Sequence, residues 1–411
     1  MTTILTGALA VRVFLSFASG FFLSYVLRTI SAVIAPALTA DFGLTNAQLG
    51  ALASAYFLSF ALAQLPLGVW LDRFGSRRTN AALLAIGALG CLAFALATSA
   101  WMLWLSRALI GIGVSGALMA AFRAFRFWYA PERQQQLAAW MMLAGSLGAL
   151  TATLPVHGLL PIVGWRGVFM LMAVLLAVVS VAIWFLLPHE PTQPVQSLSS
   201  QWVGYFDVLG DRYFWRYAIP AMVLYSSFVA FLGLWAGPWF INVVGLDAAA
   251  AAQALFVVSL ALMLAYLLLG AVLPALGRRG WTVPRLAVWG GLVMLISLAS
   301  ITVVEASWAW WLWVPLAIGS TAFMIIQSHV SLTFPPALTG RAFSALNLVL
   351  FAGMFLTQWL FGVVIDLMAA IESIGSGPPA FRAAMLLWVV MQVLAYLLMI
   401  AWRVGPRAQT A

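Results

Sequence analysis

Long apolar runs, separated by short polar gaps, extend along the whole sequence. Residues 81–97 and 168–187 contain no charged side chain, and neither run alternates apolar and polar positions as a barrel strand would. About 20 consecutive apolar residues cross the roughly 30 Å hydrocarbon core of a bilayer as an α-helix. The pattern predicts an all-α polytopic membrane protein with twelve transmembrane helices, at 13–37, 47–70, 79–98, 102–127, 136–159, 166–187, 216–242, 248–272, 283–303, 308–333, 341–366 and 381–403.

One gap between the apolar runs is longer and more polar than the others. Residues 188–213 include HEPTQPVQSLSSQW and lie near the middle of the chain. On either side of this gap, GVWLDRFG at 68–75 and GAVLPALG at 270–277 match at a separation of about 200 residues, and paired arginines follow both. Such repeats are common in transporters built from two related halves. We expect an N-terminal six-helix bundle at 1–187, a cytoplasmic linker at 188–213 and a C-terminal six-helix bundle at 214–411.

The composition excludes an ordinary soluble protein. Hydrophobic residues make up 65% and charged residues 7% of the 411 residues, which leaves too few charges to cover a surface in water. The net charge of +9 is carried by arginine, and a basic balance can indicate a nucleic-acid partner. The placement of the arginines in short gaps between apolar runs indicates a membrane protein instead.

The arginines also predict the orientation in the membrane. The gaps on one side hold Arg166 and Arg382. The gaps and ends on the other side hold Arg12, Arg73, Arg77, Arg78, Arg123, Arg126, Arg133, Arg212, Arg216, Arg278, Arg279, Arg285, Arg341, Arg403 and Arg407. Basic residues concentrate in cytoplasmic loops. We therefore expect a multi-pass protein of the cell inner membrane with both termini in the cytoplasm. We also expect it to be a monomer surrounded by lipid, with no nucleic-acid partner.

Residues 68–78 form a motif, GVWLDRFGSRR, with two glycines, an Asp-Arg pair and two further arginines in fixed spacing. This segment resembles the signature of the major facilitator superfamily, and it lies between the second and third predicted helices, where the family has it. The resemblance implies two pseudo-symmetric six-helix bundles and transport by alternating access. It also implies a conformational latch made of Gly68, Asp72, Arg73, Gly75, Arg77 and Arg78.

Each part of the motif has a physical reason. Gly68 would let its helix approach a neighbour closely, and Gly75 would permit a tight turn. Asp72 is an acid at the membrane edge and needs a partner; in the family it pairs with basic groups and a helix end across the interface between the halves. The arginines could instead only anchor the topology, and anchoring and latching are compatible.

Two arginines lie inside predicted membrane helices, Arg28 in 13–37 and Arg107 in 102–127. An ionisable residue at such a depth is costly and usually functional. The stretch Tyr25-Val-Leu-Arg28 looks like the first helix of the organic-anion and organophosphate branches of the superfamily, which implies that Arg28 binds an anionic substrate group. A guanidinium meets carboxylate or phosphate with two parallel hydrogen bonds. The alternative is an arginine held by backbone carbonyls or by Tyr25 for helix packing.

Further residues complete the predicted substrate site. The organophosphate branch has a second arginine on its seventh helix, but Phe228 lies in the corresponding region here, so a single arginine fits a monocarboxylate better than a phosphate ester. Arg107 could serve packing or gating instead, and Gln358 could bond to a neighbouring helix. The candidate substrate-binding residues are Arg28, Tyr25, Ser24, Arg107, Tyr225 and Gln358.

The acidic residues all lie in predicted loops or at helix ends, so we do not expect coupling through a carboxylate in the middle of the membrane. A proton carried with the anion and exchange for a counter-anion both stay open. No cluster of nucleophile, metal ligands or paired acids is present, which predicts no enzyme activity, no metal and no cofactor. The sequence favours secondary or facilitative transport of a small, carboxylate-type organic anion. The alternative is efflux or uptake of a larger amphipathic solute, such as a drug or siderophore.

Overall fold

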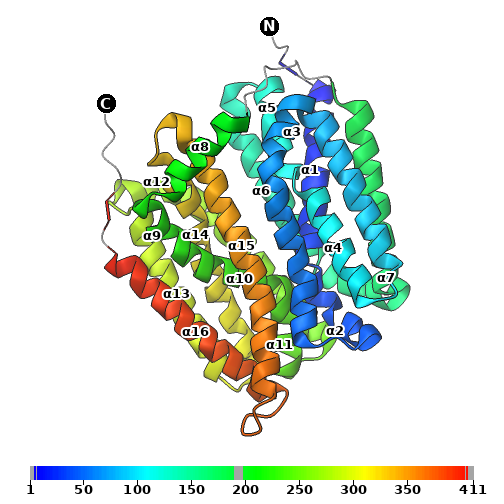
Figure 1. Ribbon diagram of the computed structural model, residues 1–411, viewed down its shortest axis with the longest axis vertical. Helices are drawn as coiled ribbons and strands as arrows, with labels where there is room; N and C mark the ends of the chain where they lie inside the picture. The colour runs from blue at the N-terminus through cyan, green and yellow to red at the C-terminus, as the bar shows by residue number, and fades with distance from the viewer. Residues whose placement is uncertain (1–3, 6, 189–197, 403, 406–411) are drawn as a thin grey trace. The chain divides into compact units, whose positions relative to one another are not determined.

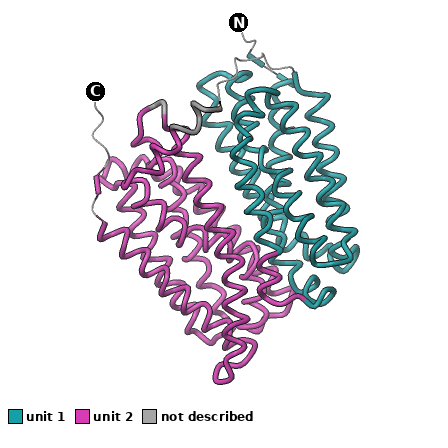
Figure 2. Tube along the Cα trace, viewed as in Figure 1, with its two compact units in different colours: residues 1–43, 52–197 teal, residues 44–51, 198–411 magenta. Residues whose placement is uncertain are grey.

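The computed structural model describes residues 4–5, 7–188, 198–402 and 404–405, and these are helical almost throughout (Figure 1). Part of the predicted linker, at 189–197, and two of the arginines used for the orientation, Arg403 and Arg407, lie outside the described residues. The chain divides into two compact units (Figure 2).

Unit 1 comprises residues 1–43 and 52–197 (teal in Figure 2). Helix α1 packs against α5, α6 and α7 within it. Its helices are α1 (Gly7–Thr29), α2 (Ser31–Phe42), α3 (Asn46–Ala95, of which the first turns belong to unit 2), α4 (Ala100–Val114), α5 (Ala117–Trp128), the 3-10 turn η1 (Pro131–Arg133), α6 (Gln134–Thr151) and α7 (Leu154–Leu186).

Unit 2 comprises residues 44–51 and 198–411 (magenta in Figure 2). Helix α14 packs against α12, α13 and α15 within it. Its helices are α8 (Leu198–Leu209, inside the predicted linker), α9 (Arg212–Pro220), η2 (Ala221–Tyr225), α10 (Ser226–Ala230), η3 (Phe231–Trp235), α11 (Ala236–Asn242), α12 (Ala248–Arg278), α13 (Val283–Val303), η4 (Ser307–Leu312), α14 (Trp313–Leu332), α15 (Pro336–Ala369) and α16 (Pro378–Ala401).

Ten helical stretches in the described part of the chain are long and apolar enough to cross a membrane. Two of them are interrupted by a glycine in the left-handed region, α3 at Gly75 (φ 76°, ψ 168°) and α7 at Gly164 (φ 65°, ψ 174°). An L-residue with a side chain rarely adopts such angles, so glycine permits both turns. Divided at these two turns, with the start of α7 continuing α6, the stretches give the twelve helices that the sequence predicts.

The first predicted helix, 13–37, is wrong in its bounds and its continuity. The helix starts at Gly7 and is divided at Ile30, where α1 ends and α2 begins. The backbone at Ile30 stays helical (φ −57°, ψ −26°), so the hydrogen-bonding pattern is interrupted there while the course of the chain continues. The cause is tertiary, because the Leu27 carbonyl oxygen in the last turn of α1 accepts a hydrogen bond from Arg107 of α4.

The helix predicted at 216–242 is also interrupted, by two π-helical turns. In η2 the Ser226 amide donates to the Ala221 carbonyl, and in η3 the Ala236 amide donates to the Phe231 carbonyl, five residues back in each case. Proline lacks an amide N–H and disturbs the ladder of a helix. Pro220 directly precedes the first π turn and Pro238 follows the second. Such π turns are rare and often mark functional segments.

Arg166 and Arg382 make the same kind of contact in their own units. Arg166 donates to the Ala97 carbonyl (3.3 Å), just beyond the C-terminus of α3, and pairs with Asp41 at 3.0 Å. Arg382 donates to the Thr302 carbonyl (3.3 Å), in the last turn of α13, and pairs with Glu305 at 3.0 Å. Cations at helix C-termini are favourable because they satisfy free carbonyls at the negative end of the helix dipole.

The two arginines should differ in their contribution to stability. The Arg382 side chain is 20% exposed and that of Arg166 is 44% exposed, so solvent screens the guanidinium of Arg166 and its bond to the helix end more. We expect Arg382→Ala to lower the free energy of unfolding by about 1 kcal/mol and Arg166→Ala by about half of that. Titration with SDS in mixed micelles measures both values. An equal or larger effect at Arg166 would contradict this assignment.

Candidate functional site

Arg28 lies near the end of α1 in unit 1, with its side chain half-buried. Its guanidinium carbon is 4.6 Å from the ring centre of Tyr25, one helical turn earlier, and 5.6 Å from the ring centre of Phe60 on α3. A guanidinium over an aromatic face is attracted by the negative face of the ring. The two rings therefore hold Arg28 in place while part of its side chain stays accessible.

Two aromatic residues of α3 connect Arg28 to Arg107. The ring of Phe60 stacks on that of Tyr56 at 6.0 Å between centres, and the Arg107 guanidinium carbon is 5.8 Å from the Tyr56 ring centre. Sequence reasoning missed Tyr56 and Phe60. Their spacing of four residues places both on one face of the helix predicted at 47–70, and a tyrosine in that apolar run was the available signal.

Ser24 is buried and faces Tyr56. Its hydroxyl lies 3.4 Å from the Tyr56 hydroxyl, which donates to the Ser24 carbonyl oxygen at 3.2 Å. The Tyr56 hydroxyl thus ties α3 to α1 one turn before Arg28. Gly20, Ser24, Arg28 and Ser31 follow one another at helical spacing. Gly20 and Ser31 are buried like Ser24, and Arg28 is the one of these four residues that keeps some exposure.

Arg107 is 1% exposed and is hydrogen-bonded to the break between α1 and α2. Its Nη1 donates to the Leu27 carbonyl at 2.9 Å, and its Nη2 donates to the Ser31 hydroxyl. A buried carbonyl without a donor costs about 1–3 kcal/mol. This geometry corresponds to the packing role that the sequence left open for Arg107. The bonded carbonyl belongs to Leu27, the residue that precedes Arg28.

The helices around Arg28 carry no acidic residue of their own. Helix α1, the part of α3 before Asp72, and α4 contain no aspartate or glutamate. Asp41, at the end of α2, pairs with Arg166 at 3.0 Å and accepts a hydrogen bond from Trp165 at 2.8 Å. These contacts, that of Trp165 first, hold the pKa of the Asp41 carboxyl below its ordinary value. The charge on these helices is therefore positive.

The two site residues predicted in unit 2 occupy different environments. Tyr225 is the last residue of η2 and is half-buried. Gln358 of α15 is 1% exposed, and its Nε2 donates to the Ala230 carbonyl at 3.4 Å, directly before η3. The backbone carbonyl oxygen of Gln358 accepts a hydrogen bond from Trp235 Nε1 at 3.1 Å. Gln358 therefore bonds to the neighbouring helix, the alternative that the sequence left open.

A polar cluster beside the π turns was missed by sequence reasoning. The Ser227 hydroxyl accepts from Trp388 Nε1 at 2.8 Å, lies 3.3 Å from the Thr357 hydroxyl, and donates to the Val223 carbonyl within η2. Ser226 donates to the Leu350 carbonyl at 2.8 Å. Side chains thus bond to backbone carbonyls along the irregular segment, as a membrane interior requires.

The motif at 68–78 contains an ion pair within unit 1. Asp72 accepts from Arg123 of α5, a residue that the motif does not include. Arg77 donates to the Leu187 carbonyl at the end of α7 at 3.1 Å, so it satisfies a helix C-terminus. Arg73 and Arg78 are exposed.

The turn predicted at Gly75 is present, and the close approach predicted at Gly68 stays a prediction. A Cβ at Gly68 would meet no described atom within 4 Å.

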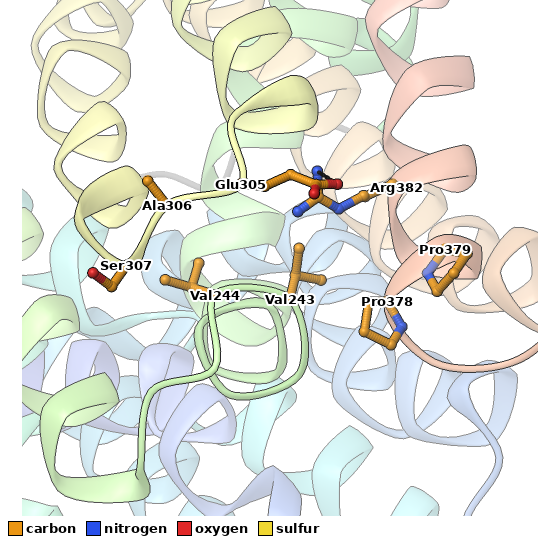
Figure 3. Close-up of a pocket in the computed structure, with 8 residues that line it drawn as sticks. All are labelled: Val243, Val244, Glu305, Ala306, Ser307, Pro378, Pro379 and Arg382. Carbon is orange, nitrogen blue, oxygen red and sulfur yellow. Dashed lines mark ion pairs between the residues drawn. The ribbon is translucent and has the colours of Figure 1, made fainter.

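A pocket of about 430 Å³ lies on unit 2, where α11, α13 and α16 have their ends (Figure 3). The ion pair between Glu305 and Arg382 lies at its edge. None of the predicted substrate residues lines it. Its lining residues are Val243, Val244, Glu305, Ala306, Ser307, Pro378, Pro379 and Arg382.

The fold and the motif agree with comparisons to known proteins. The family model described as Major Facilitator Superfamily matches residues 17–358. The chain belongs to the major facilitator superfamily. It is therefore a multi-pass membrane transporter with the twelve-helix fold of that family.

Individual relatives cover less of the chain. It is 29% identical over 234 residues (53% of this chain, 51% of the relative) to a Thermus thermophilus protein named "Probable nitrate/nitrite antiporter". It is 33% identical over 158 residues (38% of this chain, 35% of the relative) to the 4-hydroxybenzoate transporter of Pseudomonas aeruginosa. The matches thus span about half or less of these curated relatives.

Solved structures support the fold over the whole chain. A bacterial homologue of the human lysosomal transporter Spinster, in an inward-facing, unoccupied conformation, matches with a TM-score of 0.76 and 19% identity. The match covers 98% of this chain and 100% of that one. At this identity the likeness concerns the fold alone.

Arg107 gives a direct test of the site geometry. We expect Arg107→Met to lower the free energy of unfolding by about 2–4 kcal/mol, because it removes the donors to Leu27 and Ser31 from a buried position. Arg107→Lys should recover part of the loss. SDS titration in mixed micelles measures both. A variant with the stability of the wild type would show that these bonds are not needed.

Proposed function

We propose that this transporter carries small organic anions of the carboxylate class across the cell inner membrane by alternating access, with Arg28 as the group that binds the anion. The observation that carries the proposal is an arginine on a membrane helix, Arg28, which is only partly buried and whose guanidinium carbon lies 4.6 and 5.6 Å from the ring centres of Tyr25 and Phe60. A guanidinium stays charged at any pH the cell meets and binds a carboxylate with two parallel bonds.

Arg107 has a structural role that supports the proposed binding role of Arg28. Arg107 bonds to the carbonyl of Leu27, the residue before Arg28, and to Ser31, three residues after it. It therefore positions the segment that presents Arg28. Its charge adds to the positive potential of helices that carry no acid, which favours an anionic ligand.

The relatives support a negatively charged substrate, but they do not support one particular compound. The named substrates of the two relatives, nitrate or nitrite and 4-hydroxybenzoate, are small anions. Their overlap with this chain is partial. We propose the carboxylate class because one arginine supplies one bidentate partner, which matches a monoanionic head group.

The orientation belongs to the same proposal. Both termini lie in the cytoplasm, because the arginines concentrate on the side of the termini. The two arginines on the other side are each paired with an acid, Arg166 with Asp41 and Arg382 with Glu305.

Ligand-induced stabilisation of the purified protein tests the substrate class. Small carboxylates, phosphate esters, sugars and lipophilic cations are added to wild type, Arg28→Ala, Arg28→Lys and the control Arg166→Ala, and the melting temperature is measured. A ligand that binds the native state raises this temperature. We expect carboxylates to stabilise wild type and Arg166→Ala, and Arg28→Ala to bind at least about 30-fold more weakly.

Two results would contradict the proposal. Equal stabilisation of wild type and Arg28→Ala by carboxylates would remove Arg28 from the site. Stabilisation by lipophilic cations or bulky neutral compounds alone would favour the second candidate, a carrier of larger amphipathic solutes.

We further propose that Asp72 of the motif controls the conformational equilibrium through its ion pair with Arg123. If the pair acts as a unit, Asp72→Asn, Arg123→Gln and the double variant should shift that equilibrium by the same amount, about three- to tenfold. The measurement is the alkylation rate of a single engineered cysteine in a Cys91→Ala background. Additive shifts would show that the two residues act separately.

A further inference from the structure

The first turn of α3 is held by a helix far away in the sequence. Residues 44–51 belong to unit 2, whereas the helix continues in unit 1 from Leu52. Asp366, in the last turn of α15, accepts three hydrogen bonds from this turn. They come from the Asn46 amide (3.3 Å), the Asn46 side-chain Nδ2 (2.8 Å) and the Ala47 amide (2.8 Å).

This turn also has a local cap of its own. The Thr45 amide donates to Gln48 Oε1 at 3.0 Å, and the Gln48 amide donates to the Thr45 hydroxyl at 3.2 Å, which is a capping box. The capping box satisfies the backbone amides of residues 45 and 48, and Asp366 satisfies those of residues 46 and 47. Water can satisfy free amides at an exposed helix start. The helix can therefore begin at Asn46 without Asp366, whose bonds serve to attach the turn to α15.

The contact continues along both helices. A Cβ at Gly50 would lie 2.5 Å from the Gln358 carbonyl oxygen, and a Cβ at Gly362 would lie 2.2 Å from the Asn46 carbonyl oxygen. Both distances are too short for any side chain. On α15, residues 358, 362 and 366 follow at intervals of four and share one face, as do residues 46 and 50 on α3. The two glycines thus permit the close fit that brings Asp366 onto the helix start.

We infer that Gln358, Gly362 and Asp366 form a releasable clasp for the first turn of α3, and that the Asp366 carboxylate holds it closed. A carrier alternates between conformations, and a contact present in one of them sets the equilibrium. The clasp acts within unit 2 on the first turn of α3, whose later residues, from Leu52 on, belong to unit 1. A carboxylate at the positive end of a helix stabilises the conformation in which the first turn of α3 is bound to α15. When this turn separates from α15, water replaces the carboxylate as the acceptor for the amides. The inference rests on membership of the transporter family and is independent of the substrate.

Cysteine alkylation measures the opening of the clasp without any substrate. Ala47, half-buried in the clasp, is replaced by cysteine in a Cys91→Ala background, and its reaction with a maleimide is followed in detergent. When closing is fast, the rate follows the population of the open state. We expect Asp366→Asn to raise the rate about tenfold. The matched control is Asp247→Asn, because Asp247 caps the start of its own helix, α12, through the Ala250 amide at 2.7 Å. It should leave the rate unchanged.

A second pair of variants tests the close fit. Gly362→Ala places a Cβ against Asn46 and should also raise the rate, whereas Gly340→Ala, on the same helix with no atom within 4 Å of its Cβ, should not. Unchanged alkylation in Asp366→Asn, or an equal rise in Asp247→Asn, would overturn the inference. Because no ligand is added, its failure is distinguishable from failure of the proposed anion specificity.

Discussion

A bilayer offers no water to the backbone, so every interruption of a membrane helix needs a donor or acceptor from the protein. The departures from regular helix in this structure follow that constraint. The break between α1 and α2 is met by Arg107, which donates to the Leu27 carbonyl. Beside the π turns, Gln358 donates to the Ala230 carbonyl and Ser227 to the Val223 carbonyl. Most buried polar side chains described above are therefore bonded to backbone, and this accounts for their positions.

The same constraint separates the two membrane arginines. Both are costly in an apolar environment. Arg107 is fully buried, with its guanidinium bonded to the helix break, and so it fixes the local structure. Arg28 is only partly buried and contacts the faces of two aromatic rings, those of Tyr25 and Phe60. Arg107 thus fixes the segment that contains Arg28, the arginine proposed to bind the anion.

Three carboxylates in the described part of the chain bind the starts of helices. Asp211 and Asp247 cap the starts of α9 and α12, and Asp366 binds the start of α3 from another helix. Asp72 instead pairs with a basic side chain, Arg123. A local cap stabilises its helix in every conformation. A carboxylate supplied from elsewhere stabilises only the conformation in which the two helices meet, which is why Asp366 is suited to control a conformational change.

The sequence by itself determined the twelve membrane helices, the family and the turn at Gly75, because apolar run length, arginine placement and a glycine at a tight turn are local properties. It also placed Arg28 and Tyr25 on one helix face, because they are three residues apart, and in the structure the two side chains are in contact. Only the tertiary structure decided that Arg107 and Gln358 bond to backbone, that Tyr56 and Phe60 complete the surroundings of Arg28, and that Asp366 binds α3. These depend on which helices are neighbours. The length of a continuous apolar run predicts the length of the helix. Positions that face lipid and positions that face other helices are equally apolar, so the run does not predict which helices are neighbours.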